Sequence, residues 1–187
     1  MTFHPLPSLP SSHHITRRVN MNHSDQKAAW DQRWLALKLP PLLLVALVAA
    51  GIWSTSALLP MQWVTPLRWA VAAVFGAAGL AVCVAGVWAF RQARTTVSPV
   101  APENASALVV RGIYRWTRNP MYLGFVLGLL GWSLALGTWS GVLWCAALVC
   151  YLQRYQIRPE EAVLRQKFGA DYVAYCAQVG RWWGYGI

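Results

Sequence analysis

Charged residues are scarce in this sequence, and histidine is missing from most of it. Only 12% of the residues are charged, against about 25% in a typical soluble domain. All four histidines lie near the N-terminal end, at His4, His13, His14 and His23. The rest of the chain therefore cannot form the histidine clusters of metal-dependent oxidases and desaturases. Any reaction there has to proceed without a histidine base.

Cysteine is also sparse, and its spacing excludes the usual cysteine sites. The four residues form no Cys-x-x-Cys pair, and three of them lie in apolar stretches: Cys83, Cys145, Cys150 and Cys176. We therefore expect free and mostly buried thiols, not a metal centre or a disulfide framework.

Three long stretches contain no Asp, Glu, Lys, Arg or His: residues 39–67, 69–90 and 119–153. Carriers of ions and protons generally need such side chains deep in the membrane. Transport and channel functions are therefore disfavoured. Polar chemistry is expected only at the ends of the apolar stretches.

The sequence is rich in apolar and basic residues. Hydrophobic residues make up 57% of it, twelve residues are tryptophan, and the mean hydropathy is positive. These values indicate a bilayer as the solvent. The net charge of +10 fits Lys and Arg placed beside anionic cytoplasmic lipid. No basic helix or aromatic platform in a soluble segment favours nucleic acid as a partner.

The apolar stretches predict an all-α integral membrane protein with four transmembrane helices, over residues 41–59, 69–90, 120–136 and 140–156. A single helix over 119–153 would be about 52 Å long, too long for about 30 Å of hydrocarbon. Residues 137–141 (Gly-Thr-Trp-Ser-Gly) therefore divide it into a hairpin. In the second span, Gly76 and Gly79 are expected to let another helix approach closely.

The N-terminal residues predict a disordered tail at 1–26, with the membrane domain over 27–187. The tail is rich in Pro, Ser, His and Asn. No apolar segment of a secretory signal follows Arg17-Arg18, and Met21 is a candidate start. Residues 27–38 mix tryptophan with basic residues and suit a short interfacial segment.

The distribution of basic residues predicts the orientation. Fifteen of the sixteen Lys and Arg lie in the N-terminal part up to Lys38, in the 91–118 loop or in the C-terminal part from Arg154 onward. The remaining one, Arg68, lies at a span edge. The turns near 60–66 and 137–141 are uncharged. By the positive-inside rule, both termini and the 91–118 loop are cytoplasmic. We expect the bacterial inner (plasma) membrane.

After the fourth span, residues 159–179 predict cytoplasmic amphipathic helices. Apolar residues recur at steps of three and four, and Gly169 is expected to break the segment into two short helices. The apolar positions are Val163, Leu164, Phe168, Tyr172 and Tyr175.

Two polar clusters fall on the predicted cytoplasmic side, the first over residues 111–124. Its arginines can be explained as lipid-phosphate anchors (Arg111, Arg115, Arg118), and its aromatics as an interfacial belt (Tyr114, Trp116, Tyr122). Neither explanation accounts for Asn119-Pro120 at the entrance to a span. Free backbone N–H groups and the positive helix end can receive a carboxylate or a nucleotide there.

The second cluster is Arg158-Pro159-Glu160-Glu161. A proline at the first helical position followed by two acids would complement the positive helix end. Alternatively, one carboxylate binds an ammonium group or ribose hydroxyls. Both explanations can hold at once.

An ordered set of residues carries a family resemblance, over roughly residues 95–182. It runs Thr96-x-x-Pro99, Gly112-x-Tyr114, Arg118-Asn119-Pro120-x-Tyr122-x-Gly124, Glu160-Glu161-x-x-Leu164-x-x-x-Phe168-Gly169-x-x-Tyr172-x-x-Tyr175 and Val179-x-Arg181. Any one piece is weak, but the ordered set is specific. The chain resembles the superfamily of isoprenylcysteine carboxyl methyltransferases and phospholipid methyltransferases.

The resemblance implies an S-adenosylmethionine-dependent methyltransferase whose cofactor binds between the two clusters. Glu160 and Glu161 would contact its amino or ribose groups, and Tyr172 would close over it. The prenylcysteine enzymes have histidine where this chain has Asn119, a departure that bears on the acceptor and leaves the cofactor site in place. Prenylated cysteine, a phospholipid amine, a small thiol and other apolar acids all stay open as acceptors. The remaining cofactor-pocket residues implied are Arg118, Asn119, Pro120, Tyr122 and Gly124.

Such a reaction suits a membrane surface, where a charged, water-soluble donor can meet a lipophilic small molecule or lipid. Most of the catalysis can come from positioning. A carboxylate or thiolate acceptor needs no base, and Arg158 or Arg181 could hold it. An amine acceptor needs a route for proton loss, which Glu160 or Glu161 could supply. No metal is expected. The alternative is a non-catalytic membrane subunit or small-molecule carrier with the same fold.

Overall fold

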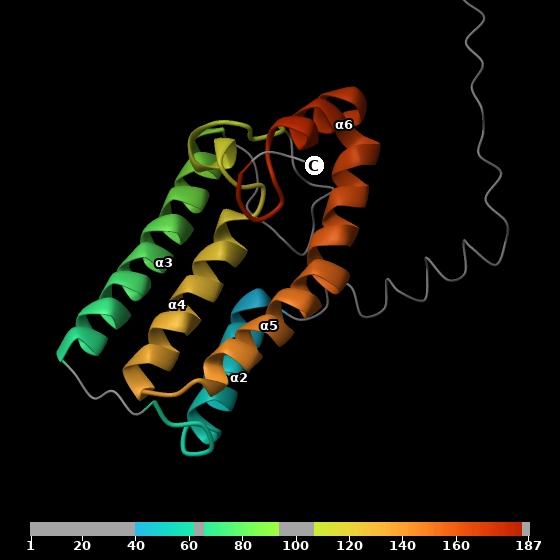
Figure 1. Cartoon of the computed structure of the whole chain (residues 1–187). Helices are drawn as coiled ribbons and strands as arrows, with labels where there is room; N and C mark the ends of the chain where they lie inside the picture. The colour runs from blue at the N-terminus through green and yellow to red at the C-terminus, as the bar shows by residue number, and fades with distance from the viewer. Residues whose placement is uncertain (1–39, 62–65, 94–106, 185–187) are drawn as a thin grey trace, which may run out of the picture.

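The computed structural model describes residues 40–61, 66–93 and 107–184. The regular secondary structure of these residues is helical, with one isolated β-bridge from Pro60 to Thr138, so the predicted all-α class is confirmed for this part of the chain. Figure 1 shows the arrangement. The elements are α2 (Pro41–Ser54), α3 (Pro66–Gln92), the 3-10 turn η2 (Gly112–Arg115), α4 (Pro120–Leu136), α5 (Ser140–Leu152), the π-helical turn η3 (Gln153–Ile157) and α6 (Arg158–Gln178).

Several predictions fall on other residues. The disordered tail at 1–26, the candidate start Met21, the interfacial segment 27–38 and the element Thr96-x-x-Pro99 all lie outside the described residues.

Helix α2 is shorter than the span expected at 41–59, because hydroxyl side chains compete for its last carbonyl groups. Thr55 Oγ1 donates to the carbonyl of Gly51 at 2.7 Å, and Ser56 Oγ donates to that of Trp53 at 2.8 Å. Such side-chain bonds favour turns over a continuing helix. The turn leads to Leu59, whose carbonyl accepts a hydrogen bond from the backbone of Trp139 in the α4–α5 connection.

Helices α3 and α4 lie side by side along most of their length, in contact through glycines (Figure 1). A Cβ on Gly79 would lie 2.6 Å from the carbonyl oxygen of Gly124, and one on Gly131 would lie 2.9 Å from that of Ala72. Only glycine allows backbones this close. The expectation that Gly79 serves packing is therefore confirmed, whereas a Cβ on Gly76 would meet nothing within 4 Å.

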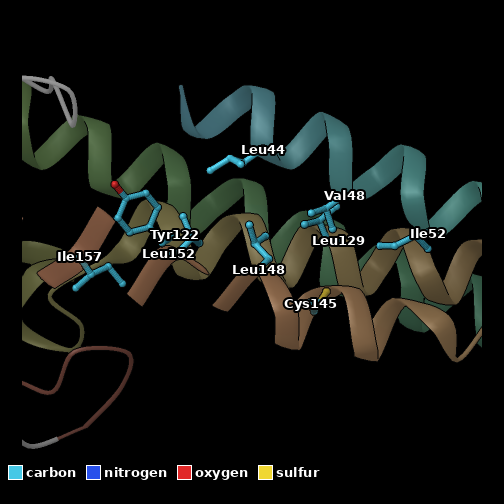
Figure 2. Packing of buried hydrophobic residues seen from close by; sticks show 9 residues of the cluster. All are labelled: Leu44, Val48, Ile52, Tyr122, Leu129, Cys145, Leu148, Leu152 and Ile157. Atoms are coloured by element: carbon cyan, nitrogen blue, oxygen red, sulfur yellow. The ribbon is translucent and has the colours of Figure 1, made fainter. Parts of the chain in front are cut away.

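The largest apolar core lies between α2, α4 and α5 (Figure 2). Ile52 and Leu152 are almost completely buried in it. Tyr122 and Ile157 lie at one end of this core, so the same packing that joins the helices also holds the start of α4 beside η3. The buried members are Leu44, Val48, Ile52, Tyr122, Leu129, Cys145, Leu148, Leu152 and Ile157.

Helices α5 and α6 form one continuous helical path through η3, which corrects one sequence-based explanation. Residue 157, before α6, already has helical dihedral angles, so Glu160 and Glu161 do not follow a free helix start. They therefore do not serve simply to complement a helix end. The π-helical turn widens the helix where the ring of Pro159 would otherwise collide with the carbonyl group of residue 155.

Helix α6 bends at Gly169, as expected from the sequence. Its backbone has φ 53° and ψ −123° there, a conformation that glycine adopts without strain. The apolar side of the bent helix packs into a second cluster together with Leu108 and Val179. This cluster holds Tyr172 and Tyr175 beside Val179, the residue that follows α6.

Much of the outer surface is apolar. One described helix, α3, is long and apolar enough to cross a membrane, and only 17% of its most apolar window is buried. Helices α2 and α4 are apolar but shorter. Large side chains on α3 are exposed, among them Val74, Leu80, Val84 and Trp88.

Candidate functional site

The two polar clusters that the sequence analysis singled out meet at the start of α4. The Tyr122 hydroxyl donates to Glu160 Oε1 at 2.6 Å, and Arg118 NH1 donates to Glu161 Oε1 at 3.0 Å. Pro120 begins α4 and is fully buried, which fixes the direction of the helix between these two contacts. Two adjacent residues of α6 thus contact two nearby residues of the α4 entrance.

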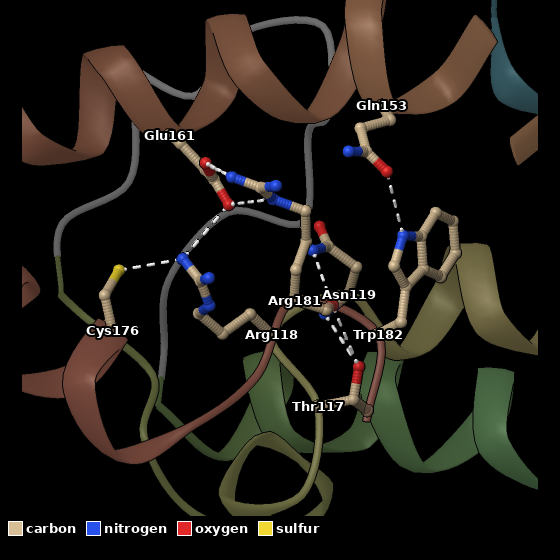
Figure 3. Close-up of polar contacts among 8 residues, drawn as sticks. All are labelled: Thr117, Arg118, Asn119, Gln153, Glu161, Cys176, Arg181 and Trp182. Atoms are coloured by element: carbon tan, nitrogen blue, oxygen red, sulfur yellow. Dashed lines mark hydrogen bonds and ion pairs between the residues drawn. The ribbon is translucent and has the colours of Figure 1, made fainter. Parts of the chain in front are cut away.

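Glu161 is neutralised by two arginines (Figure 3). Arg181 donates through Nε to Oε1 at 2.8 Å and through NH2 to Oε2 at 2.7 Å, a bidentate pair. Burial of Glu161 and Arg118 is similar, with each side chain 10% exposed. Hydrogen bonding to Glu161 raises the pKa of Arg181. A bidentate pair of this kind fixes the relative geometry of the carboxylate and the guanidinium.

Glu160 has a different environment, although it is the next residue. Its carboxyl group accepts from Tyr122 and has no arginine partner among the described residues. Burial, with a smaller contribution from the nearby charge of Glu161, raises the pKa of Glu160 to about 8. The hydrogen bond from Tyr122 acts in the opposite direction but is outweighed. The site therefore holds one charge-paired carboxylate and one that titrates near neutral pH.

Residues 179–184 cross the entrance of α4 and are bonded to it. The backbone N–H of Arg118 donates to Gly180, and Asn119 Nδ2 donates to the carbonyl of Arg181 at 3.0 Å. The backbone N–H of Gly184 donates to Trp116 at 3.2 Å. Arg181 reaches Glu161 from this segment (Figure 3). We refer to residues 179–184 as the C-terminal segment.

Two tyrosines of α6 form a buried wall beside the ion pairs. The Tyr175 hydroxyl donates to the carbonyl of Tyr114 at 2.8 Å, and Tyr172 is only 2% exposed. Burial raises the pKa of both α6 tyrosines, so their hydroxyl groups stay protonated and act as donors. This wall ties η2 to α6.

The structure separates residues that the lipid-anchor and aromatic-belt explanations grouped together. Arg111, Arg115 and Trp116 are exposed, whereas Tyr114 and Tyr122 are buried and Arg118 is nearly so. The buried members make specific internal contacts. Those two explanations therefore fail for Tyr114, Tyr122 and Arg118.

Two other predicted site residues lie apart from the polar contacts. Gly124 faces α3, where its backbone approaches Gly79 and Cys83, so packing accounts for its lack of a side chain. Arg158 is exposed on α6, and Glu161 takes its arginine partners from elsewhere.

Two residues near the site were not singled out from the sequence. Thr117 is fully buried, and its hydroxyl accepts from the backbone N–H of Asn119 at 3.1 Å. Threonine two residues before a helix entrance is a known turn pattern and could have been noticed. Cys176, taken only as a buried thiol, lies 2.8 Å from Arg118 NH1 and had no such signal.

No three His, Cys, Asp or Glu side chains gather as a metal site in the described part of the chain. A metal-free reaction stays a prediction.

The fold and the site together define an all-helical, outwardly apolar protein with a carboxylate–guanidinium cluster at one end of its helices. A family model described as phospholipid methyltransferase matches residues 67–171, more than half of the chain. The chain belongs to this family. The matched range includes α3, the entrance of α4 and both glutamates, but ends before Arg181.

Relatives of known name are methyltransferases. The protein-S-isoprenylcysteine O-methyltransferase of Saccharomyces cerevisiae is 37% identical over 79 residues, 42% of this chain and 33% of the relative. The enzyme of the same name from Schizosaccharomyces pombe is 35% identical over 72 residues, which cover 38% of this chain and 30% of the relative. The chain therefore spans about a third of these relatives.

A bacterial relative is matched almost completely. An uncharacterised protein of Haemophilus influenzae is 40% identical over 65 residues, which cover 33% of this chain and 98% of the relative. No solved structure matches the chain.

Proposed function

We propose that the protein transfers a methyl group from S-adenosylmethionine to a lipophilic acceptor at a membrane surface. The observation that carries this proposal is the contrast between Glu161, paired with two arginines, and Glu160, paired with none among the described residues. A half-buried carboxylate without a cation is suited to a cationic ligand. S-adenosylmethionine carries a sulfonium and an ammonium group.

The polar groups at the α4 entrance fit the rest of such a ligand. Nε of Arg118 is buried without a hydrogen-bond partner in the described part of the chain, which leaves one donor for a carboxylate or hydroxyl group. Asn119 and Pro120 place the positive end of α4 beside it. The hydrogen bond from Tyr122 orients Glu160. The pair of Glu161 with Arg181 holds the C-terminal segment in place, and Tyr172 forms part of the buried wall.

The bound cofactor supplies an electrophilic methyl group on sulfur. The residues of the α4 entrance and of α6 would hold the cofactor beside the acceptor, and such positioning can supply most of the catalysis. Glu160 can accept the proton of an amine or thiol acceptor, because its pKa of about 8 lies near neutral pH. A carboxylate acceptor needs no base. We assign its recognition to Arg158, because Arg181 is already bonded to Glu161.

We further propose that the protein spans the bacterial inner membrane four times, with both termini and the site on the cytoplasmic side. The exposed apolar face of α3 and the uncharged lengths of α2, α4 and α5 support this placement. The names of the family and of the fungal relatives suggest two acceptor classes, a phospholipid and a prenylated cysteine.

Calorimetric binding of S-adenosylmethionine to the purified protein in detergent tests the proposal. The wild-type protein should bind it, and Glu160→Gln should bind it about tenfold or more weakly, because a charge-assisted contact is lost. Arg165→Gln, an exposed change on the same helix, should bind like the wild type.

Folded wild-type protein that binds no S-adenosylmethionine would overturn the proposal. Equal affinity of Glu160→Gln and the wild type for S-adenosylmethionine would instead favour the non-catalytic membrane subunit or small-molecule carrier.

A further inference from the structure

An apolar groove lies between α3 and α4, toward the end of the helices away from the candidate site. Its volume is about 330 Å³, and it is shallow and open along one side. Each helix contributes positions at steps of three and four, so one face of each helix lines it. The lining residues are Trp69, Ala72, Ala73, Gly76, Gly128, Gly131, Trp132 and Ala135.

The groove exists because two of its glycines are not used for packing. A Cβ on Gly131 would lie 2.9 Å from the carbonyl oxygen of Ala72, so this glycine is needed for the helix contact. A Cβ on Gly76 or Gly128 would meet nothing within 4 Å. Both positions accept a Cβ without a clash, yet both are glycine, and their small size keeps the groove open.

Beside this groove lies a cation, Arg68, that has no anionic partner among the residues that the structure describes. The Arg68 guanidinium is stacked over Trp69, with its carbon 5.2 Å from the ring centroid, and it also lies against Gly137. Its Nε is buried and has no hydrogen-bond partner among the described residues. The sequence has no acidic residue from 32 to 102 or from 104 to 159, and the described acids are all in α6.

Part of the role of Arg68 is structural. A positive charge at the C-terminal end of α4 is favourable to the helix dipole. That role does not satisfy Nε, which is a buried donor. The groove and the unsatisfied donor are independent observations, and Trp69 belongs to both.

We propose that this groove binds one phospholipid, with an acyl chain over Gly76 and Gly128 and the phosphate group on Arg68. An acyl chain gains little by leaving a bilayer for another apolar surface, so retention has to come from a polar anchor. Phosphate supplies an anion that the described residues do not offer Arg68, and it matches the donor geometry of a guanidinium. A second copy of the chain could also fill a small-residue groove, but the apolar helix faces offer Arg68 no anion.

This site rests on the proposed membrane placement, and it is separate from the proposed reaction. Trp69 is near the start of α3, while the candidate site adjoins its end, roughly 30–35 Å away along the helix. With the site on the cytoplasmic side, the phospholipid would lie in the opposite leaflet.

Native mass spectrometry of delipidated protein, titrated with palmitoyl-oleoyl phosphatidylglycerol, tests the proposal. The wild-type chain should retain one lipid. Gly76→Leu, which fills the groove, and Arg68→Gln, which removes the anchor, should each lower retention about tenfold. Ala77→Leu, an exposed neighbour outside the groove, should retain lipid like the wild type.

Diacylglycerol with the same acyl chains should not be retained by the wild type, because it lacks phosphate. Equal retention of diacylglycerol, or unchanged phosphatidylglycerol retention in Gly76→Leu, would overturn the proposal. A dimer mass that disappears in Gly76→Leu would assign the groove to a second copy and also overturn it.

Circular dichroism in the helical range checks that Arg68→Gln is folded. If Arg68→Gln does not fold, lipid retention by Gly76→Leu still decides the test. Cofactor binding measured on the same samples separates the two proposals, because Gly76→Leu should bind S-adenosylmethionine like the wild type.

Discussion

At the scale of residues, two neighbouring glutamates have opposite electrostatic environments. Glu161 is bonded to Arg118 and Arg181, and burying it without them would be costly. Glu160 is bonded to a neutral hydroxyl group, and burial raises its pKa to about 8. Their order in the sequence gives no hint of this difference, because both are acids in the same pattern.

The raised pKa of Glu160 predicts how ligand binding depends on pH. A cationic ligand binds the ionised carboxylate, and below about pH 8 that state requires loss of a proton. Affinity for S-adenosylmethionine should therefore rise with pH, by up to about tenfold per unit, between about pH 6 and about pH 7.5, where an α-amino group stays largely protonated. Calorimetry at several pH values measures this.

Glu160→Gln should bind weakly with no such rise, since its amide does not titrate. A wild-type affinity that is flat or falls over this range would contradict the role of Glu160.

At the scale of elements, the glycine contact between α3 and α4 sets the position of the α4 entrance. Gly79, Gly124 and Gly131 let the two backbones approach, and Gly86 packs against Pro120 at the end near the site. On the other side, η3 leads α5 into α6 without a break. The α4 entrance is therefore positioned by glycine packing against α3, whereas the two glutamates are positioned by the continuous helical path from α5 through η3 into α6.

This contact predicts that Gly124→Ala is destabilising. The added Cβ would collide with Cys83 and lie 2.6 Å from the carbonyl oxygen of Gly79, and neither backbone can move freely. Overpacking of this kind costs about 1–3 kcal/mol. Thermal unfolding in detergent, followed by helical circular dichroism, should show a Tm lower by about 2–10 °C.

Gly128→Ala is the matched control, because its Cβ would meet nothing within 4 Å on the same helix. It should be neutral or slightly stabilising, as alanine favours helix over glycine. Equal losses in both variants would argue against a close contact at Gly124.

At the scale of the whole molecule, the apolar surface and the polar cluster occupy different parts. Helices α2, α4 and α5 contain no charged residue, and α3 has only Arg68 and Arg91, close to its two ends. The described acids and most described arginines lie in α6, η2 and the residues next to them. This distribution favours a site at the boundary between lipid and water.

The proposed four-span topology predicts which positions are open to each side of the membrane. Leu58 lies in the turn after α2 and is 74% exposed, and Arg165 is exposed on α6. In a background without native cysteines, Leu58→Cys in intact cells should react with a membrane-impermeant maleimide. Arg165→Cys should react only after permeabilisation, because the positive-inside rule places it in the cytoplasm.

Labelling of both positions from the same side would contradict the odd number of spans, three, that the topology places between them. Labelling of Arg165→Cys alone in intact cells would reverse the orientation.

Sequence alone determined the helical class, the start of α4 and the bend at Gly169, and the nearness of residues 118–122 to Glu160 and Glu161 was expected from the family resemblance. Proline, glycine and long apolar stretches act locally, so their effects can be read without coordinates. Only the tertiary structure decided that Arg181 and Arg118 share Glu161, that Cys176 touches Arg118, and that α6 continues α5. Those features depend on side-chain directions that are set by the π-helical turn and by the C-terminal segment where it crosses the α4 entrance. Contacts between side chains that lie far apart in the sequence leave no local pattern from which they could be predicted.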